Sequence, residues 1–495
     1  MKSISKSRFV SGAQCSKKIY FEYFRKDLKL PVSAATQQIF DLGHTVGALA
    51  QNCFPDGKDA TPEDFSDFSH SIMQTKHWIA EETKTIYEAT FATENALVML
   101  DILHRKNKEI WAIEVKSSTS VKDYHYTDAA FQYYVMSQSG CVPDHFFLMH
   151  INNKYDKNGE ISSELFHLEN ITDDIIKMQP WVAENFQNLL QVLQVGEEPL
   201  VEIGGHCSTP FDCEFSHHCW KHIPENSVFD LVNGRNIPWQ LYAEGILKME
   251  DIPEDYHLTF SQQLQVNGIK NKESYQDLNS ICDFFNTWEY PLHFFDFETL
   301  FAAVPVLDGT RPYQQVPFQY SLHILNAENR IVHEEFLADP QDFLNSTTDP
   351  RKKMIDQMKL DFLPKGSIVT YNKSFEKTRL QELATFFPED ALFLWGLIER
   401  LVDLYDIFRS RWFYMPQMRN SASIKSVLPA LAPEFSYNDL EISDGGTASS
   451  LFFESIADDT KNTQELRNNL LQYCERDTYG MVVIYNYLKD QLHSV

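Results

Sequence analysis

The hydrophobic pattern of the chain changes between strand-like and helical periods in both halves. Residues 96–118, ALVMLDILHRKNKEIWAIEVKSS, contain two apolar arms around a polar turn, which is typical of a β-hairpin. Residues 293–300, HFFDFETL, form a second strand-like apolar run. Residues 122–135 and 470–488 instead fit helices. Strands and helices therefore occur together in each half, which predicts an α/β protein.

The order of these patterns predicts three parts. Residues 1–225 mix helices with the hairpin and end in a cluster of Cys and His. Residues 226–285 are expected to be a helical connector broken by Pro and Gly. Within the connector, LYAEGILKMEDIP (241–253) is distantly similar to a helix-hairpin-helix, but a plain helical connector is the favoured interpretation. Residues 286–495 open with strands and close on a long helix, as expected for a second α/β domain.

Composition narrows the class of protein. The 495 residues are 43% hydrophobic and carry a formal charge of −27. No apolar run of membrane-spanning length occurs, so no membrane partner is expected. The first residues, MKSISKSRFVSGAQCSKKIYF, lack the apolar core of a signal peptide, which favours the cytoplasm. The negative charge opposes a protein that coats nucleic acid, but it is compatible with an acidic, metal-dependent site.

The hairpin contains the first candidate site. Asp101 lies in its first arm, and Glu114 and Lys116 lie in the second. Side chains two residues apart on a strand share a face, so Glu114 and Lys116 point the same way and Asp101 can meet them. Two carboxylates can hold a divalent ion such as Mg²⁺, and a lysine can position the attacking water. The alternative is a structural ion pair between Glu114 and Lys116.

The D…E-x-K arrangement resembles the core of PD-(D/E)XK nucleases, and KDYHYTDAAFQYYV (122–135) resembles their RecB-type continuation. The resemblance implies a restriction-endonuclease-like fold and assigns Gln132 to the metal site. RecB-type nucleases also place a metal-binding histidine on an early helix. His44 is the candidate, but its spacing from Gly43 differs, so we expect a helix residue without a metal role. Glu88 can approach the site.

A cysteine cluster closes the first domain. GGHCSTPFDCEFSHHCW (204–220) contains Cys207, Cys213 and Cys219, and Cys15 lies near the N-terminus. This layout of one remote and three clustered cysteines resembles the iron–sulfur branch of RecB-like nucleases, which includes the CRISPR-adaptation nucleases. The resemblance implies a structural [4Fe–4S] cluster on these four residues.

The alternatives for these cysteines are unligated thiols and a structural zinc ion, which three nearby histidines could help to bind: His206, His217 and His218. The spacing lacks the C-x₂-C knuckle that is typical of zinc ribbons. The other four cysteines stand apart in the sequence and are expected to be buried hydrophobic residues: Cys53, Cys141, Cys282 and Cys474.

The second candidate site starts in the run 293–300. Asp296 and Glu298 should share one face of a strand, where they can hold a cation, while Phe295 and Phe297 point into the core. This pattern resembles the first motif of DnaQ-like 3′–5′ exonucleases, which have a ribonuclease-H-like fold.

Two later segments extend the resemblance. IVTYNKSFEKTRLQEL (368–383) has Glu376 where the family usually has aspartate. In LLQYCERDTYGMVVIYNYL (470–488), Tyr473 and Asp477 lie one helical turn apart. The resemblance is to a DEDDy site, in which Tyr473 orients water and Asp477 is a metal ligand. Asp403 is a further acid for which a separate structural role is expected.

Together these features predict a metal-dependent nuclease with two candidate two-metal sites, a structural iron–sulfur cluster, and Mg²⁺ or Mn²⁺ as catalytic ions. Nucleic acid is the predicted partner, with DNA favoured. The first site is the preferred catalytic centre, because Asp101, Glu114, Lys116 and Gln132 all match. A non-catalytic nucleic-acid-binding or assembly subunit, with one or both sites silent, is the alternative.

Overall fold

A computed structural model describes residues 3–32, 34–344 and 349–493. The chain forms two compact units. Unit 1 contains residues 1–222 and 303–313, and unit 2 contains residues 223–302 and 314–495. Each unit has its own β-sheet covered by helices, so the protein belongs to the α/β class.

The sheet of unit 1 is mixed. Its strands pair in the order β2-β3-β4-β5-β6-β7, and the short β1 pairs with β4. The predicted hairpin is confirmed as β4 and β5, which are antiparallel, whereas β5 and β6 are parallel. The strands are β1 (Ile4–Ser5), β2 (Lys58–Asp59), β3 (Thr85–Ala92), β4 (Ala96–Lys106), β5 (Glu109–Lys116), β6 (His145–Ile151) and β7 (Phe166–Asn170).

The parallel step from β5 to β6 requires a crossover, which α5 provides. Phe131 of α5 is fully buried and stacks on Phe9 of α1 at 4.2 Å, and Phe186 of α7 packs against the same core. The helices of unit 1 are α1 (Lys6–Gln14), α2 (Ser16–Phe24), α3 (Ala34–Gln51), α4 (Ser69–Ala80), α5 (Asp123–Gln138), α6 (Thr172–Lys177), α7 (Gln179–Val195) and α8 (Ser216–Cys219).

The connection between β9 and β10, residues 303–313, belongs to unit 1. Ala303 is buried in a cluster with Val46 and Ile151. The Gly309 N–H donates to the carbonyl of Lys157 at 2.8 Å. Unit 1 is therefore completed by a segment that follows it by about 80 residues in the sequence.

Unit 2 is built around a five-stranded sheet of order β11-β10-β9-β12-β13. Strands β9, β10 and β11 form an antiparallel meander, and β12 and β13 continue the sheet in parallel with β9. The predicted strand at 293–300 is confirmed as the centre of this sheet. The strands are β9 (Leu292–Phe301), β10 (Gln315–Leu325), β11 (Ile331–Leu337), β12 (Ile368–Thr370) and β13 (Leu401–Asp403).

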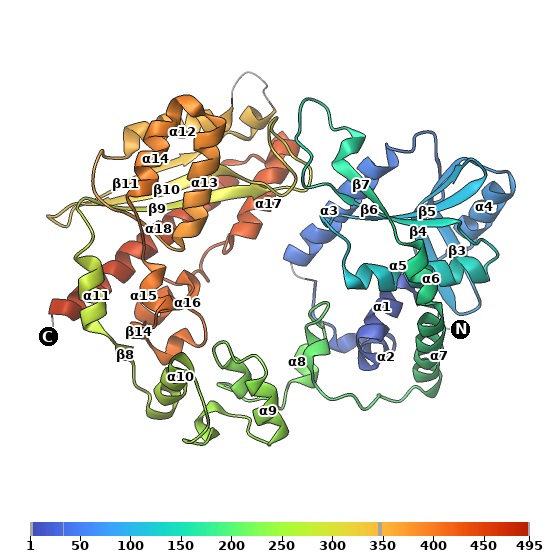
Figure 1. Cartoon of the computed structure of the whole chain (residues 1–495), viewed down its shortest axis with the longest axis horizontal. Coiled ribbons are helices and arrows are strands. Elements are labelled where there is room, and N and C mark those ends of the chain that lie inside the picture. Colours follow the sequence, from blue (N-terminus) through green and yellow to red (C-terminus); the bar gives the residue numbers. More distant parts are fainter. Residues whose placement is uncertain (1–2, 33, 345–348, 494–495) are drawn as a thin grey trace. The chain divides into compact units, whose positions relative to one another are not determined.

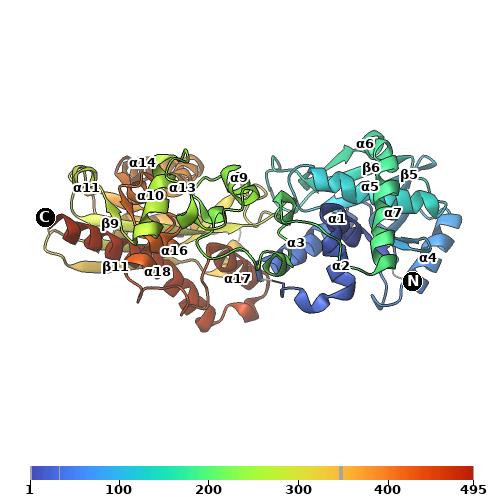
Figure 2. The same cartoon turned by 90° about the horizontal axis from the view of Figure 1, so that it is seen from below.

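Helices cover both faces of this sheet. In Figure 1, α12, α13 and α14 lie on one side of β9 and β10, and α17 and α18 lie on the other. Figure 2 shows the long α18 running beside β9 and β11. The helices of this sheet are α12 (Pro350–Asp361), α13 (Lys373–Phe386), α14 (Ala391–Glu399), α15 (Tyr405–Arg409), α16 (Ile424–Leu431), α17 (Gly445–Ala457) and α18 (Gln464–His493).

Residues 226–285 form small helices within unit 2 around a core of their own. They are α9 (Ile237–Ala243), α10 (Phe260–Asn271) and α11 (Leu278–Phe285), and a two-stranded pair joins β8 (Tyr275–Gln276) to β14 (Phe413–Tyr414). The helix-hairpin-helix weighed as the less favoured alternative at 241–253 is absent, because these described residues contain only the end of α9 and one 3₁₀ turn, η5 (Met249–Asp251).

Among the helices that the described residues form, none combines the length and the apolar character that a membrane crossing requires.

Candidate active sites

In unit 1, the hairpin brings Asp101 and Glu114 together. The paired register of β4 and β5 ends at Ile102 and Ile113, so Asp101 and Glu114 follow directly on the two strands. The carboxylate of Asp101 accepts a hydrogen bond of 2.6 Å from the N–H of Val115. Glu114 is almost fully buried, at 2% exposure.

Two lysines neutralise Glu114. The Nζ atoms of Lys6 and Lys116 lie 2.7 and 2.8 Å from the same oxygen, Oε1 of Glu114. Lys116 also pairs with Asp128 of α5 at 2.5 Å. Gln132, one turn further along α5, donates to Asp128 at 3.5 Å and is buried. All four residues predicted for this site thus lie in one network, to which Lys6 and Asp128 are added.

The acids of this network have different pKa values. Burial alone would raise the pKa of Glu114, but Lys116 and Lys6 outweigh it and hold that pKa below its usual value. Burial and the neighbouring Glu114 raise the pKa of Asp101 to about 7. Burial and Asp101 raise the pKa of Glu88 to about 8. Glu88 lies opposite Asp101 at an interruption of the β3–β4 register, where its φ is +52°.

Sequence reasoning missed two members of this network. Asp128 precedes Gln132 by four residues, so its position on the same helix face was a usable signal. Lys6 lies at the start of α1 and meets Glu114 only through the tertiary fold, for which the sequence has no local signal. His44 is an exposed residue of α3, which confirms the expected helix.

The four predicted cluster cysteines meet in unit 1. Cys15, Cys207, Cys213 and Cys219 all line one pocket, together with His206. Burial raises the pKa of Cys213 and of Cys219, and neighbouring thiols add to the effect. This convergence matches the donor set of an iron–sulfur cluster or of zinc, which both stabilise thiolates.

The remaining cysteines only partly match the expectation that they are buried. Cys141 and Cys474 are buried, whereas Cys53 is half-buried. The prediction for Cys282 is wrong, because this residue is exposed. It lies on α11, whose buried face contains Ile281 instead.

In unit 2, the alternation of β9 separates the acids from the aromatic residues. Phe295 and Phe297 are buried in the core beneath α12, α13 and α14, as predicted. Asp296 and Glu298 point to the opposite face, towards α17 and α18. The apolar run therefore has two functions: it fills the core on one face and presents two carboxyl groups on the other.

Glu376 brings a third acid to this face from the start of α13. It is 1% exposed, and burial together with the neighbouring carboxyl group of Asp296 raises its pKa well above the usual value. Asp403 has the separate structural role expected for it. Its carboxylate accepts hydrogen bonds from the N–H groups of Asn372 and Lys373 at 2.9 and 3.0 Å, which fixes the beginning of α13.

Helix α18 supplies the fourth acid. Asp477 accepts hydrogen bonds from the hydroxyls of Tyr437 and Tyr473. The sulfur of Cys474 lies 3.9 Å from the backbone oxygen of Asp296. Ligand atoms of Asp296, Glu298 and Cys474 lie within 4.8 Å of one another, so these residues can hold a metal ion.

Little positive charge offsets the four acids. Burial and mutual repulsion raise the pKa of Asp296 and of Glu298 well above the usual values. Burial, partly offset by Tyr437 and Lys425, raises the pKa of Asp477 to about 6. A cation would remove this repulsion, since clustered carboxylates and divalent ions attract one another strongly.

Sequence reasoning missed Tyr437 and Lys425, which lie outside the three motifs. Lys425 of α16 lies 5.3 Å from the ring centre of Tyr473 and 5.6 Å from that of Tyr437. Gly445, at the start of α17, lies close to Glu298, because a Cβ there would be 3.3 Å from its carboxylate. The segment 419–445 therefore closes over the acids, although no spacing rule connects it to them.

One family match lies mainly in unit 2. A family described as "Domain of unknown function (DUF2779)" matches residues 293–423. "Uncharacterized protein MG366 homolog" from Mycoplasma pneumoniae is 32% identical over 214 residues, which are 40% of this chain and 32% of that protein. "Uncharacterized protein MG366" from Mycoplasma genitalium is 24% identical over 362 residues, 64% of this chain and 53% of that protein.

A third relative, "Uncharacterized protein UU173" from Ureaplasma parvum, is 26% identical over 254 residues, 47% of this chain and 36% of that protein. The chain thus spans between about a third and a half of the length of these curated relatives. Among solved structures, "Crystal structure of SSO0001" matches with a TM-score of 0.20 and 15% identity, over 44% of this chain and 85% of that one.

Proposed function

We propose that the protein is a metal-dependent nuclease whose principal active site is the acidic cluster of unit 2. The main support for this proposal is that four acidic side chains from three elements meet in one patch with little positive charge nearby. They are Asp296, Glu298, Glu376 and Asp477. Burying several carboxyl groups together is unfavourable unless a cation is held there. The sheet order β11-β10-β9-β12-β13 supports the ribonuclease-H-like, DnaQ-type fold expected from the sequence.

The donor set favours Mg²⁺ or Mn²⁺, because carboxylate oxygens are the ligands that such hard cations prefer. When bound, two divalent ions would stabilise the charge that develops on the attacking and leaving oxygens of a phosphodiester. Asp296 and Glu298 would hold ions from β9, and Asp477 would hold them from α18. The Tyr473 hydroxyl, next to Asp477, is positioned to orient the attacking water. Glu376 reaches Asp296 directly, which supports a ligand role for it in place of the usual aspartate.

The test is a cleavage assay on the full chain with 3′- and 5′-labelled single- and double-stranded DNA and RNA. We expect Mg²⁺- or Mn²⁺-dependent loss of nucleotides from the 3′ end, abolished by Asp296→Asn. The matched control is Asp255→Asn, at an exposed position of unit 2. Equal activity in both variants would exclude the acidic cluster as the active site.

Unit 1 is proposed to be a RecB-like PD-(D/E)XK domain that binds nucleic acid. The alternative of a silent site is favoured here by one observation: Lys6 and Lys116 already neutralise Glu114, so no added cation is required to balance it. We expect Lys116→Ala to weaken DNA binding without removing the cleavage that depends on Asp296. If Lys116→Ala abolished a cleavage that survived Asp296→Asn, unit 1 would be a second active site.

The cysteine pocket is proposed to hold a [4Fe–4S] cluster with a structural function, on Cys15, Cys207, Cys213 and Cys219. The thiolates would tie the N-terminal helices to the end of unit 1. Anaerobically purified protein should show iron–sulfur absorbance that Cys219→Ser removes and that Cys282→Ser, at the exposed cysteine, leaves intact. If metal analysis found zinc instead of iron, and Cys219→Ser lost that zinc, the pocket would be a zinc site.

A further inference from the structure

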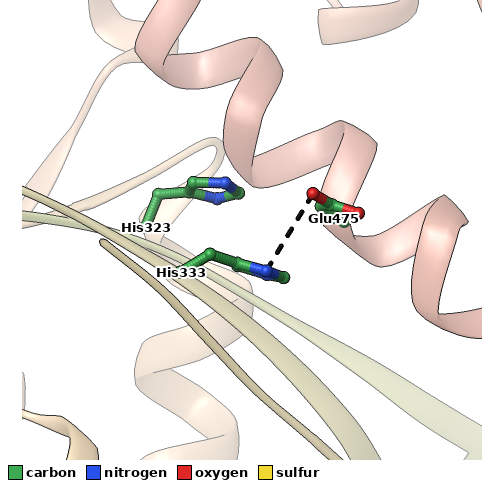
Figure 3. Close-up of side chains that lie close together, drawn as sticks. All are labelled: His323, His333 and Glu475. Carbon is green, nitrogen blue, oxygen red and sulfur yellow. Dashed lines mark ion pairs between the residues drawn. The ribbon is translucent and has the colours of Figure 1, made fainter. Parts of the chain in front are cut away.

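A second group of metal-ligand side chains lies in unit 2, on the same face of the sheet as the acidic cluster but displaced towards β11. His323 of β10 and His333 of β11 are directly paired across the two strands, and their rings stack at 4.3 Å. Glu475 of α18 faces them, with a carboxylate oxygen 3.9 Å from Nδ1 of His333 (Figure 3). The three side chains can each place one ligand atom within 4.8 Å of the others.

The free ring nitrogens are those that can reach a shared ion. Nδ1 of His323 is bonded to the hydroxyl of Thr478 at 2.9 Å, and Nε2 of His333 is bonded to the hydroxyl of Ser321 at 2.9 Å. The two hydroxyls also bond to each other at 2.7 Å. Metal-binding histidines usually have their second nitrogen fixed by such a hydrogen bond, which orients the ring. The hydroxyls of Thr478 and Ser321 provide these orienting hydrogen bonds here.

Burial and access also fit a metal site. His323 is 3% exposed, and burial together with the neighbouring His333 lowers its pKa to about 3, so its imidazole is neutral at pH 7. The side chains of His333 and Glu475 are 25% and 48% exposed. An ion can therefore enter from the Glu475 side, and water can complete the coordination. Tetrahedral zinc places its ligands about 3.3 Å apart, which rotation of the exposed Glu475 side chain can provide.

We propose that His323, His333 and Glu475 form a binding site for a transition-metal ion of the Zn²⁺ type, which fastens α18 to the sheet of unit 2. Imidazole nitrogens favour Zn²⁺ and its neighbours, whereas the carboxylate-rich cluster around Asp296 favours Mg²⁺ or Mn²⁺. Because α18 also contains Tyr473 and Asp477, the ion would hold these residues in position. The site stands on its own geometry and does not depend on the nuclease proposal.

The test is Zn²⁺ binding to the untagged, full-length protein, measured by calorimetry and metal analysis in excess Mg²⁺. Glu475→Gln and His333→Gln are compared with matched exposed controls, Glu465→Gln at the start of α18 and His257→Gln in a loop of unit 2. We expect the wild type and controls to bind one more Zn²⁺ per chain than the two site variants. The affinity loss should exceed the 10–100-fold typical of removing an outer-layer partner.

Two readouts distinguish this site from the cysteine pocket. Co²⁺ bound through nitrogen and oxygen lacks the intense thiolate charge-transfer absorbance that a cysteine site produces. Zn²⁺ should also raise the melting temperature of the wild type and controls, but not of Glu475→Gln, whose exposed position leaves the fold intact. Equal Zn²⁺ stoichiometry and affinity in all five proteins, or binding with thiolate absorbance alone, would overturn the proposal.

Discussion

The two acidic sites balance their charge in opposite ways. In unit 1, Glu114 has two lysine partners within 2.8 Å, and Lys116 is shared with Asp128. In unit 2, three further carboxyl groups gather around Asp296, and Lys425 contributes only at a distance. The first site pairs Glu114 and Asp128 with lysines, although Asp101 and Glu88 keep raised pKa values, whereas the second is a concentration of carboxyl groups with little cationic balance.

The comparison shows that matching a sequence motif and requiring a metal ion are two different properties of a site. The sequence resemblance covers Asp101, Glu114, Lys116 and Gln132 of unit 1, which made it the preferred catalytic centre on sequence grounds. Charge balance favours unit 2 instead, because buried carboxyl groups without cationic partners remain ionised only when an ion is supplied. Motif completeness therefore identifies candidate ligands, and electrostatics decides which set requires an ion.

The largest expected effect is on hydrolysis at unit 2. Asp296→Asn should lower the Mg²⁺-dependent cleavage rate by at least about 10³-fold, because ions held there supply several kcal/mol of transition-state stabilisation. The rate is measured on end-labelled substrate under single-turnover conditions. If Glu114→Gln lowered the rate by as much while Asp296→Asn did not, the order of the two sites would be reversed.

Lys6 should prove essential to the stability of unit 1. Lys6→Ala leaves the buried Glu114 with one lysine, which should lower the free energy of unfolding by about 2–3 kcal/mol, less than for a fully broken buried pair. Urea denaturation measures the change, with the exposed Lys154→Ala as control. If Lys6→Ala left the free energy of unfolding unchanged, the ion pair between Lys6 and Glu114 would not stabilise unit 1. Adding Glu114→Gln should recover part of the loss.

Tyr473→Phe should separate water orientation from metal binding in unit 2. Removal of the hydroxyl should lower the cleavage rate by about 10²-fold, the lower end of proton-transfer effects. The dependence on Mn²⁺ concentration should stay unchanged, because the carboxylates remain. A shift of the Mn²⁺ midpoint with an unchanged maximal rate would assign Tyr473 to the metal site instead.

The smallest effect concerns pH. The folded-state pKa of Asp477 is raised to about 6, so the folded protein retains a proton that the unfolded chain has released. In the presence of a chelator, the free energy of unfolding should therefore fall by about 1–2 kcal/mol as the pH rises from about 4 to about 6. Denaturation curves at pH 4 and 6 measure it. Added Mg²⁺ should remove the fall, and Asp477→Asn should reduce it; a rise with pH would contradict the raised pKa.

The sequence by itself determined the local elements and the faces of their side chains. The two-residue spacing in HFFDFETL was sufficient to separate Asp296 and Glu298 from Phe295 and Phe297, because a strand alternates its faces regardless of what surrounds it. The four-residue spacing of Tyr473 and Asp477 likewise placed both on one face of a helix. Such periodic relations are encoded by backbone geometry alone.

Only the tertiary structure decided which charges meet. Lys6 reaches Glu114 across 108 positions, and Tyr437 reaches Asp477 across 40, with no local spacing to indicate either contact. The pairing of His323 with His333, and the approach of Glu475 to both, likewise depend on strand register and on the packing of α18. The energy of a charge depends on every neighbour within a few ångströms, so it is fixed by the fold as a whole.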